Sequence, residues 1–192
     1  MDWCKDGQFW RLTLRRGDHA KLDFGSLNGT TVVLQLYAPS VTDYTFSGDG
    51  GYITNAGTGG NGKGELRYIA PAPGRYTLYF RTAGECNDAL AYELTGYVQH
   101  LTRATLSGPR VARAHSLIKL HGAVKGLANG KVVAQSLVHG RWRTLRLVSV
   151  AATGRFTFAA RVGAPGVQRF RAVFYGDSSH LATRATYSVR VV

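Results

Sequence analysis

The sequence has little of the material from which membrane anchors, metal centres or helical domains are built. No apolar run approaches the roughly 20 residues that a helix needs to span a bilayer. Cysteine occurs twice in 192 residues, and neither cysteine stands in a CxxC or Cys/His spacing typical of a metal site. No segment shows the repeat of about 3.6 residues that predicts an amphipathic helix. These absences predict a chain with no transmembrane segment, no metal or other cofactor, and no helical core.

The two cysteines, Cys4 and Cys86, both lie in the first half of the chain. A disulfide between them would close a long loop and stabilise the fold by roughly 4 kcal/mol, because the unfolded chain would lose entropy. Such a bond persists in an oxidising compartment such as the cell exterior. Two buried thiols are the alternative interpretation.

The N-terminus shows no signal peptide, and Met1 directly precedes Asp2, Trp3 and Cys4. This beginning is typical of a processed chain that starts on an added methionine. Together with a disulfide, it predicts an extracellular or cell-surface location. It also leads us to expect that the chain is part of a larger exported protein.

Acidic residues are almost absent from the second half of the chain. Residues 100–192 hold 15 Lys and Arg against one acid, Asp177, for a net charge of +14, whereas residues 1–99 hold 9 against 10, for a net charge of −1. Such asymmetry favours a polyanionic partner, such as nucleic acid, teichoic acid, acidic polysaccharide or an anionic membrane face. The alternative is an arginine-rich coding bias, because 12 of the 15 are arginine and outward-facing positions would accept them.

Alternating apolar residues predict strands along the whole chain, and glycine, asparagine or proline marks the turns between them, for example at His139-Gly140. Leu34 and Leu36, for example, are two residues apart and should share one face of a sheet. Strands in the first half are predicted at 8–14, 19–24, 31–37, 43–46, 65–69, 75–81 and 89–98. In the second half they are predicted at 104–106, 117–124, 131–137, 141–150, 155–162, 167–175 and 186–192. Seven strands is the count expected for an immunoglobulin-like sandwich.

Residues 47–64 are predicted to form a long surface loop, because 8 of these 18 residues are glycine. A phosphate-binding loop is excluded since Lys63 is followed by Gly64 and a strand, not by Ser or Thr and a helix. A calcium-binding repeat is excluded as well, since Asp49 is the one aspartate in the segment. The predicted fold is therefore all-β, with two tandem β-sandwiches that cover residues 1–99 and 100–192.

The first predicted sandwich resembles the bacterial pre-peptidase C-terminal domain over residues 8–98. The segments that carry the resemblance are FWRLTL (9–14), LQLYAP (34–39), LRYIAPAPGRYTLYF (66–80) and YELTGYV (92–98). The resemblance implies a jelly-roll-like sandwich of the kind attached to secreted proteases and other exported hydrolases.

The second predicted sandwich, residues 101–192, is similar to bacterial immunoglobulin-like repeats of exported surface proteins. The carrying segments are Gly140-x-Trp142, GRFTF (154–158) and FRAVFYGD (170–177). The resemblance implies a role in spacing, display or adhesion. It also implies an inward-facing Trp142 and a Tyr-Gly-Asp turn that carries no chemistry.

No cluster of residues predicts catalysis or metal binding. Asp177, Ser178, Ser179 and His180 are chain neighbours in a predicted tight turn, and neighbours point apart, so we expect a capped turn instead of a catalytic triad. The histidines at 115 and 121 are too few to hold a metal. The acidic residues of the first half show no pair suited to acid/base chemistry. We therefore predict no catalytic residues. The alternative to this prediction is a hydrolase with an unusual sandwich fold.

One group of basic residues is a candidate ligand-binding set. Its members are Arg141, Arg143, Arg146, Arg169 and Arg171, which stand at alternate strand positions that we expect to face solvent. Guanidinium groups suit phosphates, sulfates and carboxylates. A specific nucleic-acid reader is not expected, because exposed aromatics interleaved with the charges are missing. The sequence thus predicts a non-catalytic secreted or cell-surface binding and spacer module, which would contact an anionic cell-envelope polymer or polysaccharide. A polyanion-binding protein that acts through its basic second domain is the alternative.

Overall fold

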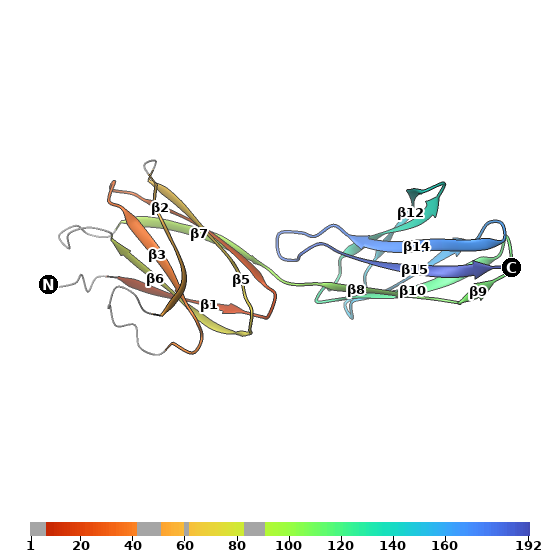
Figure 1. Ribbon diagram of the computed structural model, residues 1–192, viewed down its shortest axis with the longest axis horizontal. Coiled ribbons are helices and arrows are strands. Elements are labelled where there is room, and N and C mark those ends of the chain that lie inside the picture. The colour runs from red at the N-terminus through yellow and green to blue at the C-terminus, as the bar shows by residue number, and fades with distance from the viewer. Residues whose placement is uncertain (1–6, 42–50, 60–61, 83–90) are drawn as a thin grey trace. The chain divides into compact units, whose positions relative to one another are not determined.

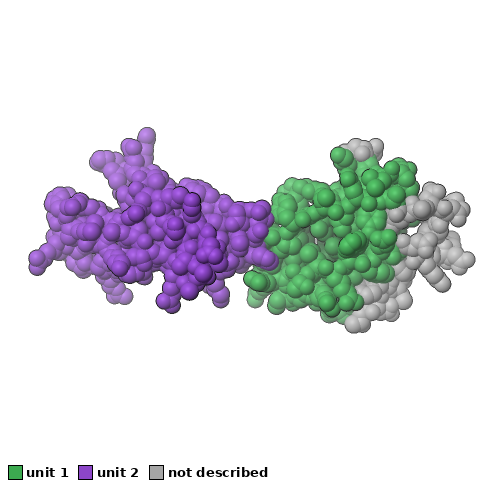
Figure 2. Space-filling model, turned by 180° about the vertical axis from the view of Figure 1, so that it is seen from behind, with its two compact units in different colours: residues 1–99 green, residues 100–192 purple. Residues whose placement is uncertain are grey.

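The protein is all-β and is built from tandem β-sandwiches, which confirms the predicted fold class. The computed structural model describes residues 7–41, 51–59, 62–82 and 91–192 (Figure 1). The chain divides into two compact units, Met1–Gln99 and His100–Val192 (Figure 2). Within the described residues, no helix is long and apolar enough to cross a membrane.

Unit 1 contains two antiparallel sheets. The four-stranded sheet has the order β1 (Gln8–Leu14), β6 (Gly74–Thr82), β3 (Val32–Tyr37) and β4 (Tyr52–Gly57). The three-stranded sheet has the order β5 (Lys63–Ile69), β2 (His19–Ser26) and β7 (Tyr92–Gln99). Leu34 and Leu36 of β3 are fully buried and share one core with Phe24 and Leu66 of the other sheet. Phe24 meets Phe80 of β6 edge to face, with the ring centroids 5.6 Å apart.

Strand β4 corrects the prediction that residues 47–64 form a long loop. Tyr52–Gly57 pairs with β3 along Val33–Tyr37, and Lys63 and Gly64 already belong to β5. The strand forms because Tyr52, Ile53 and Thr54 are strong strand formers, although the glycines around them dominate the average composition. Residues 47–50 and 60–61 of the predicted loop lie outside the described residues, as do the predicted strand at 43–46 and the two cysteines of the predicted disulfide.

Unit 2 has the arrangement of an immunoglobulin-like sandwich. Its three-stranded sheet has the order β13 (Arg155–Arg161), β10 (Leu117–Lys125) and β8 (Arg103–Ser107). Its five-stranded sheet has the order β12 (Arg141–Ser149), β11 (Lys131–Val138), β14 (Gly166–Phe174), β15 (Thr183–Val191) and β9 (Val111–Ala112). All pairings are antiparallel except that of β9 with β15.

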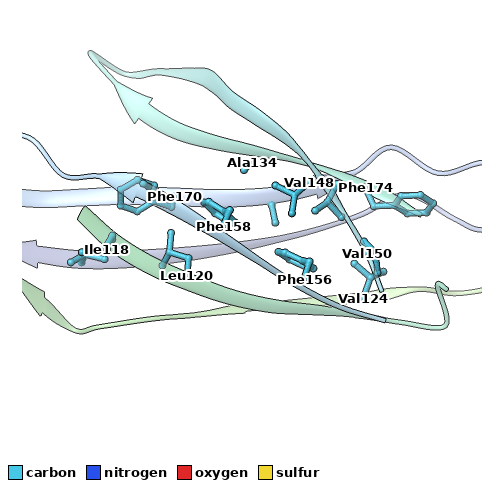
Figure 3. Close-up of a cluster of buried hydrophobic side chains, with 14 of the residues drawn as sticks. Ile118, Leu120, Val124, Ala134, Val148, Val150, Phe156, Phe158, Phe170 and Phe174 are labelled. Carbon is cyan, nitrogen blue, oxygen red and sulfur yellow. The ribbon is translucent and has the colours of Figure 1, made fainter. Parts of the chain in front are cut away.

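The core of unit 2 is filled from both sheets by every second side chain. Phe156 and Phe158 of β13 lie between the sheets together with Phe170 and Phe174 of β14 (Figure 3). Aliphatic side chains complete this core and are also drawn in Figure 3: Ile118, Leu120, Val124, Val148 and Val150. These side chains form one apolar core between the two sheets.

The hairpin turn between β11 and β12 is the one that the sequence predicts at His139-Gly140. Both residues have positive φ, 50° and 74°, and Val138 pairs directly with Arg141 across the turn. A two-residue loop with two positive φ angles is a type I′ turn, whose twist matches that of the strands. This tight turn fixes the register from which the edge strand β12 begins.

Replacing Leu120 with alanine should lower the free energy of unfolding of unit 2 by about 2–5 kcal/mol, because its side chain is fully buried and the change leaves a cavity. The matched control in the same strand is Leu117→Ala. Leu117 is 68% exposed, so its truncation should cost about 0.5 kcal/mol or less. Amide hydrogen exchange in β10 and β13 measures both losses. Equal protection in the two variants would contradict the placement of Leu120 in the core.

Candidate functional site

Four outward charges of unit 1, Lys21, Asp23, Glu65 and Arg67, form a network of ion pairs. On the outer face of β2 and β5, the ammonium of Lys21 lies 2.8 Å from Asp23 and 3.0 Å from Glu65. Arg67 forms a further ion pair with Glu65. Hydrogen bonds from Arg67 and then from Lys21 lower the pKa of Glu65 to about 2. These charges therefore compensate one another and leave little field for a charged partner.

The lysines and arginines of unit 2 form no ion pair with the carboxylates of residues 7–41, 51–59, 62–82 and 91–192, in contrast to Lys21 and Arg67. The one acidic side chain of unit 2, Asp177, lies 2.9 Å from the Nδ1 atom of His180. The field of these charges is therefore directed outward and is screened by salt alone.

The three predicted arginines of β12 lie on one face of the five-stranded sheet. Arg146 pairs with Ala134, whose side chain is in the core. Arg143 pairs with Ser136 on the same face, and Arg141 lies two residues before Arg143 and so shares that face. All three are exposed because β12 is an edge strand. Charged side chains on an edge strand prevent association with the edge of another sheet. These arginines therefore have a structural role that requires no bound ligand.

The two predicted arginines of β14 lie on the opposite face. Arg169 and Arg171 flank Phe170, which points into the core, so both side chains point outward. Arg171 pairs with Gln135 of β11. The structure thus divides the five arginines into a group of three and a group of two on opposite faces, and they do not form one continuous stripe.

Trp142 lies on the outer face, which corrects the prediction that it faces inward. Counted back in steps of two from the core residue Val148, Trp142 should face the core. A β-bulge in the pairing of β11 with β12, between Ala134 and Gln135, adds one residue to β12 and reverses the faces of all residues before it. The same bulge turns Arg141 and Arg143 away from the outer face.

Trp142 and Gln135 hold Arg171 in place on the outer face. The guanidinium carbon of Arg171 lies 4.2 Å from the centroid of the Trp142 ring, a cation–π contact. The Nε atom of Arg171 donates a hydrogen bond of 2.6 Å to Oε1 of Gln135, and Gln135 Nε2 donates one of 3.2 Å to Thr144. Gln135 is only 6% exposed. Arg171 is therefore positioned by side chains that are themselves packed.

Two further arginines on this face were not predicted. Arg184 and Arg190 of β15 are exposed and alternate with inward residues such as Val189. Arg184 pairs with Val173 of β14, and Arg190 pairs with Val167. The alternation of Arg190 with apolar neighbours was a visible signal, but the predicted strand began at residue 186 and so left out Arg184.

The outer face of the three-stranded sheet of unit 2 is also basic. Its five cationic side chains, all exposed, are Arg103, Lys119, Lys125, Arg155 and Arg161. Lys125 lies directly opposite Arg103, where like charges destabilise a strand pair. Nη1 of Arg161 donates a hydrogen bond of 2.8 Å to the backbone oxygen of His115. Unit 2 therefore presents positive charge on both outer faces.

The Asp177 segment forms the capped turn that the sequence predicts. The backbone N–H of Ser179 donates a hydrogen bond of 2.8 Å to Oδ1 of Asp177, and the His180 ring lies against the same carboxylate. His121 contacts Thr157 instead of His115, with 3.2 Å between Nδ1 and Oγ1. Residues 7–41, 51–59, 62–82 and 91–192 contain no group of three or more His, Cys, Asp and Glu placed to hold a metal ion.

Comparison with known proteins identifies no family. No protein-family model matches the sequence, and no curated protein matches it. Among solved structures, the chain is similar to the crystal structure of the CARDB domain of the PF1109 protein in complex with di-metal ions from Pyrococcus furiosus. The two sequences are 19% identical, the match covers 47% of this chain and 87% of that chain, and the TM-score is 0.33. This likeness says nothing of what the present chain binds.

The pKa of Asp177 should lie below its ordinary value of 3.8. Partial burial raises this pKa, but hydrogen bonds from the Ser179 amide and the His180 ring together lower it further than burial raises it. Because the folded-state pKa is lowered, the stabilisation is present above the unfolded value and is lost as pH falls through the folded-state pKa. Carboxyl-carbon NMR titration measures the pKa, and a value at or above 3.8 would contradict the capped turn.

Proposed function

We propose that this chain is a non-catalytic binding and spacer segment of an exported bacterial protein, and that its second unit binds an anionic polymer at the cell envelope. The observation that carries the proposal is the cationic surface of unit 2, which lacks carboxylate partners among the described residues. Like charges held close together repel one another, and a bound polyanion relieves this repulsion and releases its own counterions.

The two sandwiches support the non-catalytic part of the proposal. Alternate side chains of each unit are buried in its own core. In this proposal, residues 8–98 are a pre-peptidase C-terminal-like sandwich that serves as the spacer. Residues 101–192 are a bacterial immunoglobulin-like sandwich that serves for display and binding. Turnover in a broad glycosidase and peptidase screen would contradict this assignment.

Binding through unit 2 is tested with heparin, a sulfated polysaccharide, as the probe. The intact chain should be retained on heparin resin at about 0.15 M salt and not on neutral dextran, and its affinity should fall steeply as salt rises. A variant with Arg11, Arg15, Arg16 and Arg75 of unit 1 changed to glutamine should elute at nearly the same salt concentration. Failure of the wild type to bind, or an equal loss in this unit 1 variant, would contradict the proposed function.

An extracellular location is tested through the predicted disulfide between Cys4 and Cys86. After expression in an oxidising compartment, the chain should carry no thiol that reacts under denaturing conditions, and its mass should be lower by two hydrogens. Removing the bond by Cys4→Ser and Cys86→Ser should lower the free energy of unfolding by roughly 2–5 kcal/mol. Two reactive thiols in the unfolded wild type would contradict the disulfide and would support the alternative of buried thiols.

A further inference from the structure

We infer that the outer face of β14 and β15 in unit 2 binds a linear acidic polysaccharide through Arg169, Arg171, Arg184 and Arg190. These four residues are called the arginine face. This inference rests on the proposed function and specifies both the surface and the class of polymer.

The register of β14 and β15 places the four arginines in a zigzag line along the strands. Arg190 pairs with Val167 at one end, Arg184 pairs with Val173 at the other, and Arg169 and Arg171 occupy the two positions between them on β14. Positions two apart on a strand are separated by about 6.6 Å, so the line extends over about 20 Å. Regularly spaced cations over this length suit a linear polymer with repeated anionic groups.

Arg171 gives this line a guanidinium that is ordered before any ligand arrives. Its guanidinium group lies over the ring of Trp142, and its Nε atom donates a hydrogen bond to Gln135. The two Nη atoms of Arg171 make no hydrogen bond to any residue that the structure describes, so they can donate to the two oxygens of a carboxylate or sulfate. A side chain that is already ordered loses less entropy on binding.

Hydroxyl groups beside the arginines favour a polysaccharide over a nucleic acid. Thr186 pairs with Arg171, Ser188 pairs with Arg169, and both hydroxyl side chains are on exposed residues. Hydroxyls can donate to and accept from sugar hydroxyls. Single-stranded nucleic acid is bound instead by bases that stack on open aromatic rings. The Arg171 guanidinium occupies one face of the Trp142 ring, so no base can stack on that face.

The other basic face of unit 2 lacks this organisation and provides a matched control. Two of its five cations, Lys119 and Lys125, are lysines, whose ammonium groups cannot form bidentate contacts. Arg161 is already bonded to a backbone oxygen. The two faces thus have similar charge on the same unit but differ in how their cations are arranged.

The test compares two variants of the full chain that each lose four positive charges. The first changes Arg169, Arg171, Arg184 and Arg190 to glutamine. The control changes Arg103, Lys119, Lys125 and Arg155 to glutamine. With a heparin octasaccharide at about 0.15 M salt, the first variant should bind at least about tenfold more weakly than wild type and the control at most about threefold more weakly. Equal weakening of the two would overturn the inference, because net charge alone would then explain binding.

A single substitution keeps the test valid if the fourfold variant fails to fold. Arg171→Lys retains the charge but loses the planar guanidinium, so binding should weaken several-fold, whereas Arg103→Lys should leave it unchanged. Equal affinities of these two variants would overturn the inference.

Two further outcomes distinguish an error in the inferred class of polymer from an error in the proposed function. Tighter binding of an oligodeoxythymidylate of equal charge would overturn the polysaccharide but leave polyanion binding intact. Absence of heparin binding by the wild type would overturn the proposed function together with the inference.

Discussion

The burial of every second side chain is the constraint on which the rest of this structure depends. In β14, Phe170 fills the core of unit 2, so Arg169 and Arg171 on either side of it must face solvent. In β15, Arg190 stands in the same way between the buried Val189 and Val191. Because the apolar core fixes the orientation of each strand, it also fixes which side chains reach the outer surface.

A single β-bulge in the pairing of β11 with β12 interrupts the alternation of inward and outward side chains beside the arginine face. The extra residue in β12 exchanges the faces of the residues that precede it, so Trp142 reaches the outer face and Arg143 leaves it. Without the bulge, Trp142 could not contact Arg171, and the guanidinium of Arg171 would lack its aromatic support. A one-residue irregularity thus decides which cation is ordered.

The sequence predicted the strands well because alternation is a local property. The first strand, 8–14, and the turn at His139-Gly140 occur where they were expected. The sequence did not show β4, because flanking glycines conceal a short strand whose partner, β3, lies far along the chain. It did not show the shared surface of the arginines either, because which residues share a face across strands depends on pairing register and on the bulge. The candidate surface could therefore be identified only from the structure, although Arg169 and Arg171 were among the predicted residues.

The two units differ in the number of acidic residues available to pair with their surface cations, and this difference favours unit 2 as the binding surface. Unit 1 joins Lys21 and Arg67 to carboxylates, whereas unit 2 has a single acid for all its cations. The most direct test of the account is backbone-amide NMR mapping of the intact chain during titration with heparin. If the arginine face is the binding surface, the shifts should be concentrated in β14, β15 and the Trp142 indole. Shifts spread equally over β10 and β13, or centred on unit 1, would contradict it.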